Sequence, residues 1–123
     1  MVEPLPLLIK ASDIPLSENR YPGAISRVVR GDQHGLDVII AVSSYPHGVG
    51  PPEHRHRCAE VFVVYEGRGV YTVDGVDVIA EPGDVVVAPA NAWHSFRGDG
   101  EVPLRHVTVI EHAHDVGNER KST

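Results

Sequence analysis

The sequence predicts an all-β domain built as a sandwich or a jelly-roll barrel. Twelve glycines and ten prolines among 123 residues imply many turns between short elements. Short runs rich in valine, isoleucine, tyrosine or phenylalanine recur along the chain, and no segment shows a helical period of useful length. Eight or more short strands joined by such turns are typical of these two architectures.

The expected strands follow one another from residue 24 to residue 111. They occupy residues 24–30, 36–43, 60–65, 69–73, 76–80, 84–88, 94–97 and 104–111. Turn residues of the Gly, Pro or Asp type separate the later strands at 66–69, 74–75, 81–84 and 98–100. Asp74-Gly75 stands between alternating residues and therefore predicts a two-residue hairpin.

We expect three regions within one domain. At 123 residues the chain is long enough to bury one hydrophobic core. The barrel is expected at residues 24–111 and is preceded by an N-terminal arm at 1–23. The polar tail at 112–123 lacks a hydrophobic pattern, so we expect it to fray. The sequence contains no internal repeat and no linker.

The charge and the cysteine content of the chain indicate which partners and which cellular compartment to expect. The net charge of −6 and the pI of about 5.7 argue against a nucleic-acid surface, which is usually basic, so a small molecule is the expected partner. A single cysteine rules out an intrachain disulfide. The N-terminus lacks a basic start and no apolar run approaches membrane-spanning length, so we expect a cytoplasmic protein with no membrane partner.

Two histidines and a glutamate near the middle of the chain have the spacing of metal ligands. Residues two apart on a strand point to the same face, so His54 and His56 present their imidazoles side by side. Glu60 has the same parity four residues later and can add a carboxylate oxygen. His94 follows a strand-like run and a turn that could return it to the other three. The alternative is that these are ordinary polar residues on strands.

This stretch resembles the first motif of the cupin family. The family motif reads Gly, five residues, His-x-His, three or four residues, Glu, six residues, Gly. Every fixed position is filled here, by Gly48, His54, His56, Glu60 and Gly67.

A second motif of the same family is matched less completely. It reads Gly, five residues, Pro-x-Gly, two residues, His, three residues, Asn, and the corresponding residues are Gly83, Pro89, Asn91, His94 and Gly98. Asn91 replaces a glycine, and asparagine tolerates positive φ better than most residues. Gly98 replaces the asparagine and removes no ligand. The resemblance implies a double-stranded β-helix (jelly-roll) barrel with the metal held inside near one mouth.

The donor set implies one divalent metal ion per chain. Three imidazoles and one carboxylate suit Fe, Mn, Ni, Co, Cu or Zn, and the sequence does not choose among them. Four protein ligands on an octahedral ion would leave two positions for water, dioxygen or a bidentate substrate, as catalytic sites do.

Apolar side chains are expected to surround the metal. Phe62 and Val64 share the parity of Glu60, and Phe96 shares the face of His94. These three side chains are therefore candidates for the substrate pocket, although Phe96 is equally well explained as core.

Polar candidates precede the ligands in the chain. Tyr45 and His47 lie on the approach to the ligand loop, so we expect them near the metal as catalytic proton carriers. Glu60 could itself move protons if its bond to the metal is loose, as the family resemblance implies. Arg27 or Arg30, on an early strand, could reach the pocket and clamp an anionic group of the substrate.

The resemblance implies a metal-dependent protein that acts on a small organic molecule. A dioxygenase is the leading interpretation, because a reducing metal with two adjacent open positions can hold a chelating enolate beside O2. A cyclase or isomerase that uses the metal as a Lewis acid comes next. A barrel that binds a small ligand or a metal without catalysis is the third interpretation.

The apolar strands also predict a homodimer. Segments 61–65 and 85–88 carry apolar residues on both faces, which is more than one barrel interior can bury. Small cupins usually pair their barrels, and the apolar segment 5–9 could serve as a swapped strand.

Overall fold

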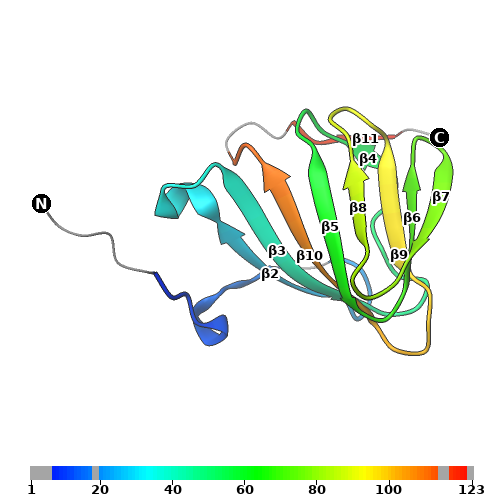
Figure 1. Cartoon of the computed structure of the whole chain (residues 1–123), viewed down its shortest axis with the longest axis horizontal. Coiled ribbons are helices and arrows are strands. Elements are labelled where there is room, and N and C mark those ends of the chain that lie inside the picture. The colour runs from blue at the N-terminus through cyan, green and yellow to red at the C-terminus, as the bar shows by residue number, and fades with distance from the viewer. Residues whose placement is uncertain (1–6, 18–19, 114–116, 122–123) are drawn as a thin grey trace, which may run out of the picture.

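The computed structural model describes residues 7–17, 20–113 and 117–121, which form two antiparallel sheets (Figure 1). The larger sheet has the order β1 (Leu16–Ser17), β2 (Ile25–Arg30), β3 (Val38–Tyr45), β10 (Leu104–Glu111), β5 (Glu60–Glu66) and β8 (Val85–Ala88). The smaller sheet has the order β11 (Glu119–Arg120), β4 (His54–Arg55), β9 (His94–Gly98), β6 (Gly69–Val73) and β7 (Val76–Ala80). Two short 3-10 helices, η1 (Ala11–Asp13) and η2 (Gly31–His34), precede β1 and β3. The predicted all-β jelly-roll fold is confirmed.

The eight expected strands all form, and each of their ends lies within two residues of the prediction. The sequence pattern does not predict β1, β4 or β11, because each has only two residues and cannot show an alternation. The hairpin expected at Asp74-Gly75 joins β6 to β7, with Val73 opposite Val76. Both turn residues have positive φ, 47° and 79°, as a tight hairpin turn between twisted strands requires.

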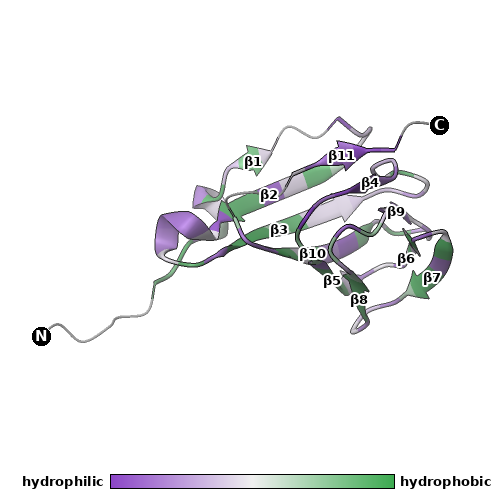
Figure 2. Cartoon of the chain, turned by 90° about the horizontal axis from the view of Figure 1, so that it is seen from above, coloured by the Kyte–Doolittle hydropathy of each residue, from purple (hydrophilic) through white to green (hydrophobic). Residues whose placement is uncertain are grey.

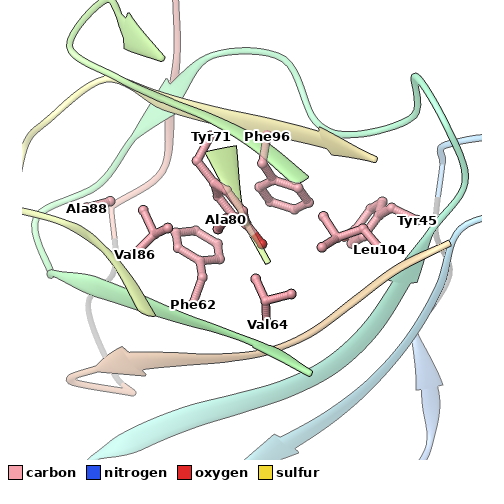
Figure 3. Close-up of a cluster of buried hydrophobic side chains, with 9 residues drawn as sticks. All are labelled: Tyr45, Phe62, Val64, Tyr71, Ala80, Val86, Ala88, Phe96 and Leu104. Carbon is pink, nitrogen blue, oxygen red and sulfur yellow. The ribbon is translucent and has the colours of Figure 1, made fainter. Parts of the chain in front are cut away.

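The core lies between the two sheets, where alternate residues of each strand point inward (Figure 3). On β5, Phe62 and Val64 are each 1% exposed, whereas Val63 on the other face is only partly buried. Tyr71 of β6 and Leu104 of β10 complete the centre of this core, and both are buried. Each such side chain stabilises the fold by about 1.5–3 kcal/mol relative to an exposed one. These side chains form the packed core of the barrel.

Apolar residues also remain on the outer surface of the barrel. β7 and β8 are edge strands of the two sheets, and hydrophobic residues mark the outer strand β7 (Figure 2). The exposed side chains on these strands are between 42% and 63% exposed, and they are Val76, Val78, Ile79, Val85 and Val87. The expected surplus of apolar residues on an outer face is therefore present.

Part of the polar C-terminal segment forms a strand, which corrects the expectation that the whole tail frays. Strand β11 pairs with β4 of the metal-ligand segment. The Nε atom of Arg55 lies 2.9 Å from Oε2 of Glu119, and the amide of Lys121 donates to the carbonyl of Glu53 at 3.1 Å. Ion pairs and backbone hydrogen bonds hold this strand, so a hydropathy pattern does not reveal it. Residues 114–116 and 122–123 lie outside the described residues.

The N-terminal arm is described from residue 7 onward. Strand β1 pairs with β2 of the same chain, with Leu16 opposite Arg27. Leu7 and Leu8, within the segment expected to swap, are exposed, while residues 5 and 6 lie outside the described residues. The swapped strand stays a prediction. In the described part of the chain, no helix has the length and apolar character needed to cross a membrane.

Candidate metal centre

Four donor side chains meet between the two sheets. His54 lies on β4, Glu60 begins β5 and His94 begins β9, while His56 lies in the connection from β4 to β5. Their ligand atoms all lie within 4.8 Å of one another. His54 and His94 are direct partners across β4 and β9, with ring centroids 4.3 Å apart. The four residues expected to hold a metal are therefore brought together.

The carboxylate of Glu60 stands closest to two of the imidazoles. Its Oε1 lies 2.9 Å from Nε2 of His56 and 3.3 Å from Nε2 of His94. His56, Glu60 and His94 are buried, whereas His54 is partly exposed. Burial removes competing water from three of the four donors, so the interactions of these groups with a cation are stronger than they would be at the surface.

Backbone carbonyl groups fix the orientation of all three histidines. In each ring the Nδ1 atom donates to a carbonyl oxygen two residues away: Pro52 for His54 at 2.9 Å, Cys58 for His56 at 2.7 Å and Ala92 for His94 at 2.9 Å. A carbonyl oxygen can only accept, so each Nδ1 carries a hydrogen and each neutral ring keeps its lone pair on Nε2.

This arrangement fits a metal ion. In the neutral rings, the Nε2 lone pairs of His56 and His94 point at a Glu60 oxygen that also carries only lone pairs. Such atoms repel one another unless a cation, either a proton or a metal ion, lies between them. Three imidazole nitrogens and a carboxylate oxygen suit several divalent metals, and the carbonyl groups behind the rings are the usual support of histidine ligands.

The ionisation of the site favours a cation. Burial raises the pKa of Glu60, but in the absence of a metal a proton on Nε2 of His56 or His94 can donate to this carboxylate; these hydrogen bonds and the resulting ring charges outweigh burial and lower the pKa to about 2. Burial lowers the pKa of His94, yet its contact with the Glu60 carboxylate outweighs this effect and raises the pKa overall. Burial lowers the pKa of His54. A charged carboxylate at neutral pH therefore faces imidazoles that a metal can share.

A cavity of about 480 Å³ opens beside these residues, and His54, His56 and Glu60 form part of its wall. The inward face of the larger sheet supplies polar side chains to the same wall, among them Ser43, Tyr45, His106 and Thr108. This volume is within the range of small-molecule sites. A bound metal would therefore be accessible to a small organic ligand.

Of the three apolar residues expected in the pocket, one lines the cavity and two lie in the core. Phe96 lines the cavity, and its ring packs edge-on against Tyr45 with centroids 4.8 Å apart. Phe62 and Val64 point into the barrel, as their parity predicts, but they belong to the core and not to the cavity wall, which corrects their expected role. Each step of two residues along β5 moves about 7 Å away from Glu60, so shared parity does not place all three side chains at one depth.

Only one of the two expected proton carriers lies at the cavity. Tyr45 is buried and lies on the cavity wall. His47 is exposed, forms a bridge with Gly98 and does not line the cavity, so its expected place near the metal is wrong. The reason is that β3 ends at Tyr45 and the chain turns at Pro46, whose carbonyl accepts from the amide of Val49 at 3.1 Å.

Neither arginine of β2 reaches the cavity, which corrects the expected anion clamp. Arg27 alternates with Ser26 and Val28, which line the cavity, so its side chain faces away and donates to two carbonyl oxygens of the N-terminal arm at 3.2 and 3.0 Å. Arg30 pairs instead with Asp32 at 3.3 Å. The alternation of side chains along β2 was sufficient to show that Arg27 does not face the cavity.

Sequence reasoning misses most of the cavity wall, including Arg20, Arg120 and His106. Arg20 and Arg120 line it and are exposed. They come from the arm and from β11, where no strong pattern predicts structure. His106 also lines the cavity and is only 1% exposed. It shares the inward parity of Leu104 and Thr108 on β10, a signal that could have identified it.

Comparison with known proteins agrees with this description. Residues 41–110 match the cupin domain family, so the chain belongs to the cupins. Gentisate 1,2-dioxygenase from a Ralstonia species is 29% identical over 114 residues, covering 86% of this chain and 32% of that protein. Auxin-binding protein 1 from Arabidopsis thaliana is 37% identical over 117 residues, covering 86% of this chain and 59% of that protein. The polyketide cyclase RemF from Streptomyces resistomycificus has a TM-score of 0.79 at 15% identity, covering 97% of this chain and 87% of that chain.

The chain spans about a third of the gentisate dioxygenase and about three fifths of the auxin-binding protein. The likeness to RemF shows the fold alone. Family, fold and donor set together define a cupin with a site able to bind a metal ion.

Both departures from the second family motif have a local explanation. Asn91 has a φ of 66°, the left-handed conformation that glycine adopts most easily, and its amide donates to the carbonyl of His56 at 2.8 Å. A Cβ atom at Gly98 would lie 2.4 Å from the carbonyl oxygen of Pro46. An asparagine therefore does not fit at position 98 with this backbone.

Proposed function

We propose that this cupin is a metal-dependent dioxygenase that acts on a small aromatic or enolic acid. The observation that carries the proposal is the position of His54, His56 and Glu60 on the wall of a cavity large enough for such a molecule, with His94 beside them. Similarity to a gentisate 1,2-dioxygenase supports the choice of reaction class. The four ligands leave room for further ligands on an octahedral ion.

A reducing divalent metal held by these residues would supply open coordination positions at which a chelating acid and dioxygen can meet. The residues of the chain hold that arrangement in place. The carbonyl groups behind His54, His56 and His94 keep each ring in one orientation. The rings of Phe96 and Tyr45, which pack edge-on, give one part of the cavity an aromatic wall against which a ligand ring could pack.

Tyr45 is the proposed proton carrier for this reaction. Its side chain lines the same cavity as His56 and Glu60, and a phenol can give a proton to an oxygen of the substrate or take one from it. Glu60 is a second candidate for proton transfer, provided that its carboxylate exchanges between the metal and a proton.

An acidic substrate fits the charges around the cavity. Arg20 and Arg120 bring two positive charges to its wall, although the chain as a whole carries a net charge of −6. Positive side chains at a cavity attract anions from solution and lower the cost of holding a carboxylate near the carboxylate of Glu60. We therefore expect the substrate to carry at least one carboxylate or enolate.

Oxygen uptake tests the proposal. The full chain is stripped of metal, reloaded anaerobically with Fe(II), Mn(II), Ni(II) or Cu(II), and offered 2,5-dihydroxybenzoate, a catechol, a flavonol and a β-diketone. We expect metal-dependent oxygen uptake with at least one pair, lost in His94→Ala and retained in Tyr65→Phe, an exposed control. Protein that holds metal but consumes no oxygen would contradict the proposal, and conversion without oxygen would indicate a cyclase or isomerase.

Ligand binding without turnover is the second candidate function. Similarity to auxin-binding protein 1, whose name describes binding, favours it. The same cavity would then retain an acid and release it unchanged. Calorimetry of the zinc-loaded protein with indole-3-acetate separates the two functions, because tight binding with neither oxygen uptake nor conversion supports the binding function alone.

A further inference from the structure

We propose that His106, held in place by Tyr71, donates a hydrogen bond to the substrate and selects acids that carry a second oxygen atom away from the metal. The inference rests on the proposed function, because it concerns ligands of the same cavity. His106 is not one of the four residues grouped around the metal site, yet it lines the cavity that those residues border.

The pair of Tyr71 and His106 is buried inside the barrel. The hydroxyl oxygen of Tyr71 lies 2.7 Å from Nδ1 of His106, and each residue is 1% exposed. Burial raises the pKa of Tyr71 and lowers the pKa of His106 to about 4, so both groups are neutral near pH 7. A neutral phenol and a neutral imidazole form this bond in one of two directions.

The direction of the bond follows from the available partners. Within the described residues, Nδ1 of His106 is the recorded hydrogen-bond partner of the Tyr71 hydroxyl. If Nδ1 were the donor, the hydroxyl hydrogen would be left without an acceptor in the core, which costs about 1–3 kcal/mol. The hydroxyl of Tyr71 therefore donates to Nδ1, and the hydrogen of the neutral ring is on Nε2 of His106.

The remaining N–H group of His106 faces the cavity. No side-chain nitrogen or oxygen that is fully buried in the described part of the chain lacks a hydrogen-bond partner. Nε2 of His106 has no recorded protein acceptor among these residues, so it is not fully buried. Since the residue lines the cavity, Nε2–H is the group that it offers there.

The position of His106 in the sheet separates it from the metal ligands. On β10 it lies opposite Ser43 of β3, whereas Ile110 lies opposite Glu60 of β5. Four residues of strand separate the backbones of His106 and Ile110 by about 13 Å along the sheet. A ligand that binds the metal through one end must therefore extend along the cavity to reach Nε2 of His106. A hydrogen bond from Nε2 would then need an acceptor atom, such as an oxygen, at the end of the ligand away from the metal.

The surroundings of His106 make this donor selective. Its ring packs against Phe96 at 4.7 Å and Phe62 at 5.4 Å, with Tyr45 at 5.6 Å. In such an apolar slot, a ligand that displaces water without accepting the Nε2–H bond leaves a polar group unpaired. Sites of this kind reject analogues that lack the matching polar group more strongly than apolar pockets reject a missing methylene.

A matched pair of ligands tests the inference. 2,5-Dihydroxybenzoate and 2-hydroxy-5-methylbenzoate have the same chelating end and differ by a hydroxyl or a methyl group on the far side of the ring. We expect the zinc-loaded full chain to bind the dihydroxy compound about tenfold more tightly in calorimetry. His106→Leu should abolish this preference, whereas His106→Gln, which keeps an N–H donor, should retain part of it.

The tautomer of the His106 ring tests the role of Tyr71. In the zinc-loaded protein, nitrogen NMR of labelled histidine should show His106 with its hydrogen on Nε2, and 2,5-dihydroxybenzoate should shift that Nε2 signal. Tyr71→Phe should mix the two tautomers and reduce the ligand preference while zinc content stays unchanged. Zinc content that is equal in all variants excludes a loss of the metal site as the cause.

Three results would overturn the inference. They are an equal preference in wild type and His106→Leu at equal zinc content, a His106 ring with its hydrogen on Nδ1, and no binding of either ligand. The proposed function is judged separately by oxygen uptake over its wider substrate panel, so the failure of one is distinguishable from the failure of the other.

Discussion

Nε2 of His94 lies 3.3 Å from Oε1 of Glu60, although the two residues are 34 positions apart in the chain. Glu60 begins β5 of the larger sheet and His94 begins β9 of the smaller sheet. The candidate metal site therefore joins the two sheets of the barrel. A metal ion at this site would stabilise the native chain, because binding to the folded state alone adds about 2.7 kcal/mol at a free concentration one hundred times the Kd.

Acid should destabilise the protein through His106. Burial lowers the pKa of this group to about 4 from 6.5, so between these values the unfolded chain binds a proton that the native chain does not. The contribution of neutral His106 to the free energy of unfolding is complete above the pKa of the unfolded chain, 6.5, and is lost as pH falls toward the pKa of the native chain, about 4. It is on the order of 3 kcal/mol.

Urea unfolding of the metal-free protein at about pH 7 and about pH 5 measures this effect. The wild type should lose more of its free energy of unfolding between these pH values than His106→Leu. The other histidines titrate in both proteins, so their contribution cancels in the comparison. Equal losses would mean that His106 is not held neutral by the fold.

Substitution of Tyr45 should slow turnover without loss of metal. Tyr45 lines the cavity and His47 does not, so these two neighbours form a matched pair. We expect Tyr45→Phe to reduce kcat by about a hundredfold, as loss of a positioned proton carrier typically does. His47→Ala should leave kcat and KM unchanged. Similar kcat values for Tyr45→Phe and wild type would remove Tyr45 from the mechanism.

Arg120 should set the affinity for anionic ligands. Its side chain lines the cavity, whereas Arg105 pairs with Glu66 at 3.3 Å and does not line it. We expect Arg120→Gln to raise KM for an acid several-fold, with a smaller effect at high salt because of screening. Arg105→Gln is the control for a lost positive charge. If both variants raise KM equally, the effect arises from net charge.

The exposed outer strands predict a homodimer. Val85 and Val87 on β8 and Val78 on β7 are each at least 42% exposed, and an exposed apolar edge favours pairing with another copy. Light scattering at micromolar concentration should give the mass of a dimer. Val87→Lys should shift the mass toward a monomer, whereas Val102→Lys, at an exposed position outside these strands, should not. A monomeric wild type would contradict the prediction.

The parts of the structure that follow a local pattern were predictable. The longer strands repeat every two residues, and Asp74-Gly75 has the geometry of one turn type, so both are determined by neighbouring residues. The metal ligands were predictable because His54, His56 and Glu60 lie close in sequence and match a family motif.

Other parts depend on contacts between distant segments and could not be predicted. Strand β11 exists because Glu119 meets Arg55, a residue 64 positions away in the chain. The same contact between segments places Arg120 at the cavity. Arg30 was expected there because it lies on an early strand, but it pairs with Asp32 instead. Parity gives the face of a strand but not the depth along it, which is why Phe62 is core and not pocket.

Metal analysis of the purified chain tests the central claim most directly. We predict one divalent ion per chain in the wild type, a sharp loss in His56→Ala because one of four ligands is removed, and an unchanged content in His112→Ala, whose ring is exposed and pairs with Asp37 at 2.8 Å. Equal metal content in wild type and His56→Ala, or wild-type protein that takes up no ion from solution, would contradict the account.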